Sequence, residues 1–207
     1  MYQPATFYVT MIVGVLSVAP AVRIFGAERE VAWREAGVGA PAAAYFIGKL
    51  FAELPVWALM ALNFSAPLVA VAPLRGPFGG FFALSMACIA VCSAMATALS
   101  AAFGADSDKA NLTGVILATV LNIFGGFVPL LGKGAVWCYT HFTARAFVAI
   151  ELADGYGLSD QLFGWIVGTE WATPDWPRDL GVLCLIALLA LVLAFALTVA
   201  LYRDKRR

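Results

Sequence analysis

Long stretches without a charged side chain divide the sequence into five apolar intervals. Each interval has 21 residues or more. Roughly 20 apolar residues, at about 1.5 Å of rise each, form a helix that crosses the ~30 Å hydrocarbon core of a bilayer. The intervals are 1–22, 54–74, 76–105, 110–132 and 180–202. The pattern therefore predicts five membrane-spanning segments.

The five segments are expected to be helices rather than strands of a barrel. None alternates apolar and polar residues as a barrel strand does, and backbone groups in lipid must be satisfied within their own segment. The predicted fold is all-α, a polytopic helical membrane protein of one domain, residues 1–207, with five transmembrane spans plus an outer re-entrant helical hairpin. The expected spans are about 5–25, 50–73, 80–104, 110–131 and 179–202, with a cytosolic amphipathic helix at 26–40 and an outer loop at 132–178.

The distribution of basic residues predicts the orientation in the membrane. With a cytosolic C-terminus, nine Lys and Arg residues face the cytosol and four face outside, which satisfies the positive-inside bias. Five spans then place residue 1 outside, and we interpret this as a sign that a preceding span is missing. A cleaved signal peptide ending near Ala19-Pro20-Ala21 is the alternative, but no Lys or Arg precedes its apolar run.

Composition narrows the classes of function. The chain is 62% hydrophobic and only 13% charged, against about 25% charged in ordinary soluble domains. Its 13 basic and 13 acidic residues cancel, which argues against nucleic acid as a partner. One histidine cannot build a His/Cys metal cluster, and the run 126–133 has neither the spacing nor the Ser or Thr of a phosphate loop. We expect no metal and no catalytic residue.

The first polar segment is the most charged part of the sequence. It contains Glu28, Arg29, Arg34 and Glu35 near the aromatic Trp33. A helix here would be amphipathic and would lie at the cytosolic boundary of the membrane. The segment is either a solvated connector or a docking surface for a cytosolic partner.

Two opposite charges mark the beginning of the second interval. Lys49 and Glu53 are four residues apart, so they share one face of a helix and can pair. A carboxylate that enters the membrane is costly, so we expect Glu53 to pair with Lys49 or with a cation on a neighbouring helix. A structural lock and a functional relay both remain open.

The outer segment, residues 133–178, is polar in places yet still strongly apolar. Its first part, 135–153, is too polar to span the membrane alone, which favours a re-entrant or interfacial helical hairpin. Trp165, Trp171 and Trp176 follow it, as is typical of the outer interfacial belt.

Several of these residues occur in the order typical of a known family. The series begins with Phe25, Glu28-Arg29, Arg34-Glu35, Tyr45-Phe46, Lys49 and Glu53-Leu54-Pro55, and continues with Asn122 to Gly126, Trp137, Arg145-Ala146-Phe147 and Glu151. It resembles the membrane domain of ABC transporters of the G (White) subfamily over nearly the whole chain. The nucleotide-binding domain and first span of that subfamily are absent, so we expect a fragment of a longer transporter.

The resemblance implies a type-2 ABC membrane domain with defined partners. It implies pairing with a second half-transporter, as a homo- or heterodimer, and coupling of Glu28, Arg29, Arg34 and Glu35 to a nucleotide-binding domain. ATP and Mg²⁺ would bind that domain, in the full-length chain or in trans, and no cofactor would bind these residues. The chain alone is therefore not an enzyme.

The resemblance also implies a substrate pathway. Its cavity would lie around Val13, Leu16, Ser17, Thr119, Asn122 and Phe124, and its outer gate at Phe127 and Val128. The first three cavity residues are spaced i, i+3 and i+4, so they are expected to share one helix face.

The apolar wall of this implied cavity indicates the class of cargo. It suggests a hydrophobic or amphipathic substrate, such as a lipid, sterol or xenobiotic, moved across a plasma or internal membrane. The alternative is a non-transporting membrane scaffold or partner subunit that retains the fold. An intramembrane enzyme is disfavoured, because Glu53 has no evident catalytic companion in the sequence.

Overall fold

The computed structural model describes residues 2–26, 34, 39, 41–71, 74, 76–103, 107–123, 138–152 and 175–204. Every regular element within these residues is a helix, in agreement with the all-α prediction. The helices are α1 (Tyr2–Gly26), α3 (Ala42–Val71), α4 (Phe78–Phe103), α5 (Ser107–Asn122), α6 (Tyr139–Leu152) and α8 (Trp176–Asp204).

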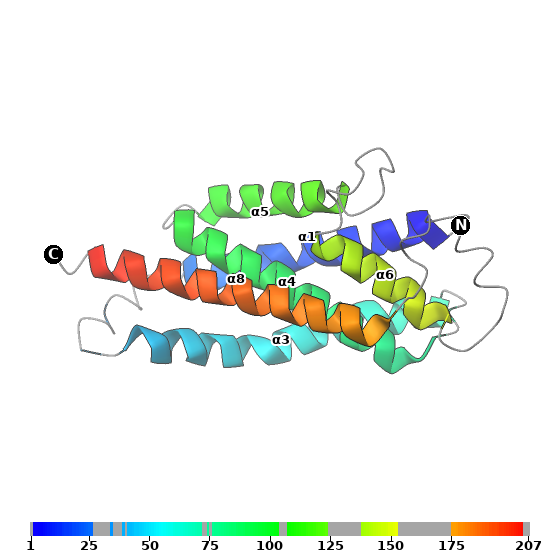
Figure 1. The fold of residues 1–207 in the computed structure, drawn as a ribbon. Coiled ribbons are helices and arrows are strands. Elements are labelled where there is room, and N and C mark those ends of the chain that lie inside the picture. Colours follow the sequence, from blue (N-terminus) through cyan, green and yellow to red (C-terminus); the bar gives the residue numbers. More distant parts are fainter. Residues whose placement is uncertain are drawn as a thin grey trace.

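The long helices run back and forth along a common direction (Figure 1). The beginnings of α1, α4 and α8 lie at one end of the bundle, and those of α3 and α5 lie at the other. We call the first of these the α6 end, because the shorter helix α6 lies there. The beginning of α1 and the end of α8 are therefore at opposite ends of the bundle.

Helix α4 is the centre of the bundle and packs against the other five helices. In its most apolar stretch 67% of the residues are buried, compared with 17% in α3 and 22% in α8. Its buried positions are mostly Ala, Ser, Cys and Gly, and such small residues let neighbouring helices approach closely in a membrane. The remaining helices pack around α4, and α1, α3, α5 and α8 present large apolar side chains outward.

Among the residues that the structure describes, three helices are long and apolar enough to cross a membrane: Ala43–Val71, Phe78–Phe103 and Trp176–Ala200. Helix α1 contributes a shorter apolar stretch, Val9–Val22. Helix α5 has 16 residues, or about 24 Å at ~1.5 Å per residue, and residues 124–131 of the span expected there lie outside the described residues. The first and fourth spans therefore stay predictions.

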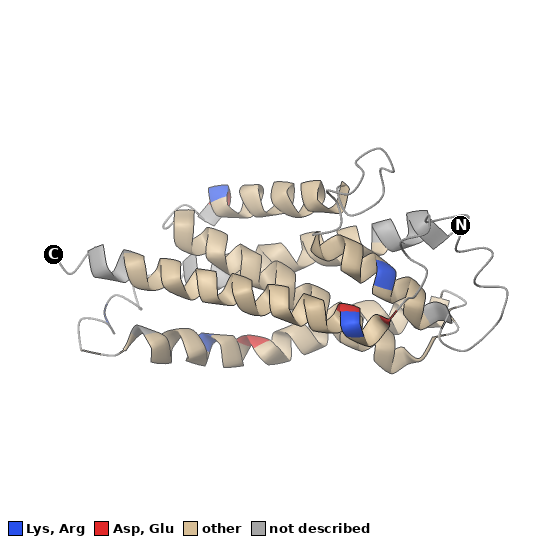
Figure 2. Ribbon diagram, in the orientation of Figure 1, with Lys and Arg blue, Asp and Glu red and all other residues tan. Residues whose placement is uncertain are grey.

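Helix α3 starts eight residues before the span expected at 50–73. Its first turn forms on Pro41, whose carbonyl accepts hydrogen bonds from the backbone amides of Ala44 and Tyr45. The helix continues through two internal prolines, which membrane helices tolerate because neighbouring helices satisfy the freed backbone groups. Lys49 and Glu53 consequently lie inside a helix, among the few charged side chains of the described bundle (Figure 2).

The structure describes only parts of the segments expected to flank the spans. In the predicted amphipathic helix 26–40, Gly26 ends α1, Arg34 is helical and exposed, and Gly39 adopts a φ of 97°. In the outer loop 132–178, α6 docks on the beginning of α4, where a side chain added to Gly76 would lie 2.6 Å from the Ile150 carbonyl oxygen. The re-entrant hairpin stays a prediction, because 153–174 lie outside the described residues.

Candidate functional site

The three expected cavity residues on α1 do not all face the same way. Val13 and Ser17 are buried, whereas 60% of Leu16 is exposed. At about 3.6 residues per turn, position 17 lies about 40° from position 13, and position 16 lies about 60° away on the other side. The boundary between the buried and the exposed side of α1 therefore lies between positions 13 and 16. Leu16 is on the exposed side, together with Ile12.

The expected cavity residues on α5 are divided in a similar way. Thr119 is partly exposed and donates a hydrogen bond of 2.8 Å to the Val115 carbonyl. Asn122 is only 2% exposed and donates a 2.9 Å hydrogen bond from Nδ2 to the Ala118 carbonyl. Asn122 therefore points into the bundle. Phe124, the last expected cavity residue, lies outside the described residues.

Helices α1 and α5 pack closely, and each carries exposed apolar side chains on the side away from this contact. A side chain added to Gly114 of α5 would lie 2.6 Å from Cγ1 of Val18 on α1. Both helices carry exposed large apolar residues, which we call the α1–α5 face: Ile12, Leu16, Leu112, Ile116, Val120 and Ile123. The four on α5 follow the three-to-four-residue spacing of a single helix stripe.

Two hydrogen bonds join α1 and α5 to neighbouring helices. Ser100 Oγ on α4 donates to the Val22 carbonyl near the end of α1, at 2.9 Å. Thr140 Oγ1 on α6 donates to the Leu121 carbonyl of α5, at 2.8 Å. Both α1 and α5 are therefore connected through polar contacts to the rest of the bundle.

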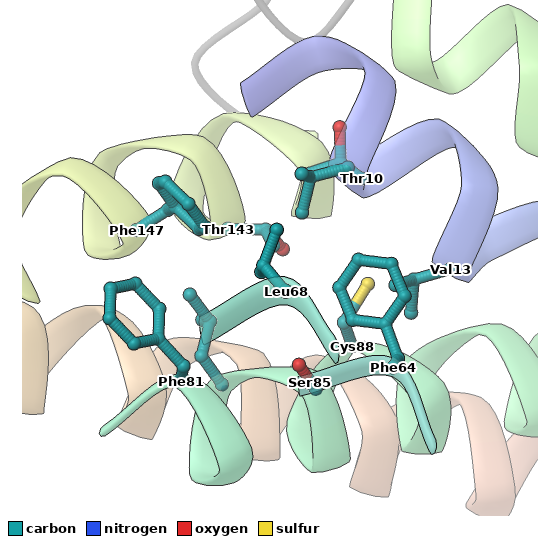
Figure 3. Close-up of a pocket in the computed structure, with 11 residues that line it drawn as sticks. Thr10, Val13, Phe64, Leu68, Phe81, Ser85, Cys88, Thr143 and Phe147 are labelled. Carbon is teal, nitrogen blue, oxygen red and sulfur yellow. The ribbon is translucent and has the colours of Figure 1, made fainter. Parts of the chain in front are cut away.

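A small pocket lies inside the bundle, between α1, α3, α4 and α6 (Figure 3). Its wall is mainly apolar and aromatic, with Phe64, Leu68, Phe81 and Phe147, and the ring centroids of Phe81 and Phe147 are 5.1 Å apart. The cavity measures about 10 Å³, about the size of one water-sized sphere. It is therefore too small for a lipid or sterol in this conformation. Of the expected cavity residues that the structure describes, only Val13 lies in its wall.

The polar pair on α3 lies at half-buried positions along one helix face. Lys49 Nζ lies 5.9 Å from the centroid of the Tyr45 ring, one turn away. Lys49 also interacts favourably with the Glu53 carboxylate through Coulomb attraction, and the Trp57 indole lies near that carboxylate, one turn further along the helix. The structure thus brings Lys49 and Glu53 together on one helix, between two aromatic side chains.

An ion pair that the sequence analysis did not predict connects α6 with α8. Arg145 binds the Asp179 carboxylate with two hydrogen bonds, and Asp179 is completely buried. The guanidinium also lies 6.0 Å from the centroid of the Phe142 ring. A sequence signal did exist, because Asp179 is a carboxylate in the first turn of a very apolar helix, and such a group needs a cation. Its partner could not be chosen from spacing alone.

Other expected site residues lie partly or wholly outside the described residues. Of the expected coupling residues the structure describes Arg34, which is exposed. Glu28, Arg29 and Glu35 lie outside the described part, as do the expected gate residues Phe127 and Val128. Within the described residues no group of three or more His, Cys, Asp or Glu side chains could hold a metal ion.

Comparison with known families identifies the chain. Residues 1–150 match the ABC-2 type transporter family. The chain belongs to the ABC-2 type transporter family. Members of this family are the transmembrane part of ABC-type transporters, not the ATPase domain, and they generally partner with nucleotide-binding domains. No curated protein matches the chain.

Family membership agrees with the apolar helices of the bundle. An ABC-2 type membrane domain is an integral membrane protein, so the exposed apolar side chains of α3, α8 and the α1–α5 face meet lipid, a partner chain or a substrate pathway instead of bulk water. The matched residues include α1 to α5 and most of α6. They thus contain both helices of the α1–α5 face.

Proposed function

We propose that this chain is the transmembrane domain of an ATP-driven exporter of the G-subfamily type, moving hydrophobic or amphipathic molecules such as lipids, sterols or xenobiotics. The family match supports a role in ABC-type transport, and the ordered residues that resemble the G subfamily support the narrower assignment. The chain would cross the membrane five times, with its C-terminus in the cytosol.

The observation that carries this proposal is the α1–α5 face. Exposed apolar side chains on two neighbouring helices are suited to lining a cavity between two membrane domains related by a two-fold axis. Leu16 and Thr119 would contact the substrate directly, because both are at least partly exposed. Val13, Ser17 and Asn122 would support them from behind, because all three are buried.

The energy for transport would come from a separate nucleotide-binding domain that holds ATP and Mg²⁺. Its closure would be felt by Glu28, Arg29, Arg34 and Glu35, and the exposed position of Arg34 is consistent with such a contact. Movement of α1 and α5 would then switch the cavity between inward- and outward-facing states. Phe127 and Val128 would close it on the outer side, and Lys49 with Glu53 would hold α3 in place.

A comparison of two engineered cysteines tests whether the α1–α5 face lines a water-accessible cavity. Leu16→Cys and Leu188→Cys replace leucines of similar exposure, 60% on α1 and 58% on α8. The background replaces Cys138 and Cys184 by serine and keeps Cys88 and Cys92, which are buried.

The readout is the rate of labelling by a charged methanethiosulfonate reagent in proteoliposomes. A charged reagent avoids lipid, so we expect residue 16 to react at least about tenfold faster than residue 188, and a hydrophobic transport substrate to slow only the first reaction. Equal, slow labelling of both positions would place Leu16 against lipid or protein and contradict the cavity. Loss of ATP-driven efflux in the labelled Leu16→Cys protein would connect the cavity to transport.

A further inference from the structure

Three polar side chains from three helices converge on a single glycine of α1. A Cβ atom added to Gly14 would lie 3.1 Å from the hydroxyl of Tyr139 on α6, 3.5 Å from Nδ2 of Asn122 on α5 and 3.6 Å from Sγ of Cys92 on α4. We call these four residues the Gly14 junction. The missing side chain of Gly14 is what allows the other three to approach the backbone of α1.

Two polar atoms at the Gly14 junction are buried and lack a partner. Asn122 is 2% exposed and Tyr139 is 3% exposed. Neither Asn122 Oδ1 nor the Tyr139 hydroxyl has a hydrogen-bond partner in the part of the chain that the structure describes. The Cys92 thiol lies near the phenol, but sulfur is a weak hydrogen-bonding atom and does not replace an oxygen partner.

The chemistry of the two atoms is complementary. Burial raises the pKa of Tyr139 well above its ordinary value, so the hydroxyl keeps its proton and can donate. Asn122 has already used Nδ2 on the Ala118 carbonyl, which leaves Oδ1 as an acceptor. The Tyr139 hydroxyl and Asn122 Nδ2 lie 3.1 Å and 3.5 Å from the position that a Gly14 Cβ would take, so the two side chains end close together beside the backbone of α1. A single small molecule that accepts and donates can therefore reach both side chains.

We propose that the Gly14 junction binds one water molecule, which accepts a hydrogen bond from Tyr139 and donates one to Asn122 Oδ1. Buried polar atoms in proteins are normally satisfied, and an ordered water is a usual partner where protein groups do not suffice. The water would tie α6 to α5 across the bare backbone of α1. Because a water can reorient, α6 could shift relative to α1 without leaving either polar atom unsatisfied.

X-ray radiolytic footprinting tests for this water in the unmodified full-length protein in nanodiscs. Hydroxyl radicals form from bound water and oxidise the nearest side chain, so Tyr139 should be oxidised about fivefold faster or more than an equally buried ring away from water. Phe46 is that control, since it is 4% exposed and packs against Phe195 with ring centroids 5.4 Å apart. Tyr139 oxidation no faster than that of Phe46 would overturn the proposal.

A double-mutant cycle tests whether Tyr139 and Asn122 act as one unit. Unfolding by SDS in mixed micelles is measured for Tyr139→Phe, Asn122→Leu and the double variant. Each single change should lower the folding equilibrium constant about tenfold, and the double variant should fall little further, because the second change has no shared water left to lose. Effects that simply multiply would overturn the proposal.

Controls separate a shared water from other outcomes. Thr198→Val removes a buried hydroxyl that bonds to the Ala194 carbonyl of its own helix, so its effect should multiply with that of Tyr139→Phe. Asn122→Leu should also bring Tyr139 oxidation down to the level of Phe46.

One combination of results would overturn the water site. If the effects of Tyr139→Phe and Asn122→Leu on stability are coupled but Tyr139 is not oxidised quickly, the two side chains share a direct hydrogen bond instead. If Asn122→Leu does not fold, footprinting of the unmodified protein decides. Neither measurement depends on transport, so the result is separate from that of the proposed function.

Discussion

Asp179, in the first turn of α8, accepts two hydrogen bonds from Arg145 of α6, although 34 positions separate the two residues in the chain. Arg145 Nε lies 2.6 Å from Asp179 Oδ2. Asp179 is fully buried and 17% of the Arg145 side chain is exposed. A two-pronged contact of this kind fixes the relative orientation of its partners as well as their distance. The pair therefore sets how α6 sits against α8.

Removing one member of this pair should destabilise the protein strongly. Arg145→Ala leaves a fully buried carboxylate without its cation, and breaking a buried ion pair in this way costs about 3–5 kcal/mol. We expect a marked loss of stability in SDS unfolding and a weakened attachment of α6. The neighbouring Arg178→Ala is the matched control, because Arg178 is exposed and its loss should change stability by less than about 0.5 kcal/mol.

The double variant Arg145→Gln/Asp179→Asn gives a second comparison. It removes both charges and keeps side chains that can hydrogen-bond, so it should be clearly more stable than Arg145→Ala. If the double variant is as unstable as Arg145→Ala, the damage comes from lost packing and not from an unpaired charge.

The close approach of α1 and α5 should depend on the absence of a side chain at Gly114. Gly114→Ala would place a methyl group 2.6 Å from Cγ1 of Val18, and overpacking of this kind costs about 1–3 kcal/mol. Thermal unfolding in detergent should show the loss, and an added Val18→Ala should recover part of it. Gly48→Ala on α3 is the control, because nothing lies within 4 Å of the added atom. Equal effects at both glycines would contradict this packing.

A smaller effect is expected where α4 is bonded to the end of α1. Ser100→Ala removes the hydrogen bond to the Val22 carbonyl, and a typical bond of this kind contributes about 0.5–1.5 kcal/mol. The change should lower the free energy of unfolding by that amount. Thr97→Val, which removes a bond to the Ser93 carbonyl within α4 itself, should cost less. The reverse order would mean that the contact between the helices is unimportant.

Coupling to the ATPase domain should depend on the charged segment that follows α1. Replacing Glu28, Arg29, Arg34 and Glu35 together by alanine in the intact transporter should leave ATP turnover largely intact and abolish the transport that depends on it. Parallel measurements of phosphate release and efflux in proteoliposomes would show this separation. If the number of molecules transported per ATP hydrolysed is unchanged, the hypothesis that this segment docks on the ATPase domain is wrong.

The sequence predicted helices well where lipid imposes the pattern. The intervals 54–74, 76–105 and 180–202 correspond to α3, α4 and α8, because a charge-free run of this length can satisfy its backbone in lipid only as a helix. The boundaries were less predictable. The expected span begins at 50, whereas α3 begins at Ala42 and includes Lys49 at a half-buried position beside Tyr45.

The site was harder to predict because it depends on which helix faces which. The spacing of Val13, Leu16 and Ser17 shows that they lie on one side of a helix. It does not show where the buried surface of that helix ends, so the exposure of Leu16 could not be predicted from the sequence. The partners Arg145 and Asp179 lie on different helices. Nothing in their local sequence states that α6 and α8 are neighbours.

The contact between Arg145 and Asp179 also bears on where the folding unit ends. The family match stops at residue 150, yet Arg145, inside the match, is neutralised by a residue that lies beyond it. A polypeptide that ends at residue 150 would lack Asp179, the counter-ion of Arg145. It would also lack α8, which packs against the central helix α4. The boundary drawn by sequence similarity therefore cuts through a single packed bundle, and α8 belongs to that bundle as much as the helices before it.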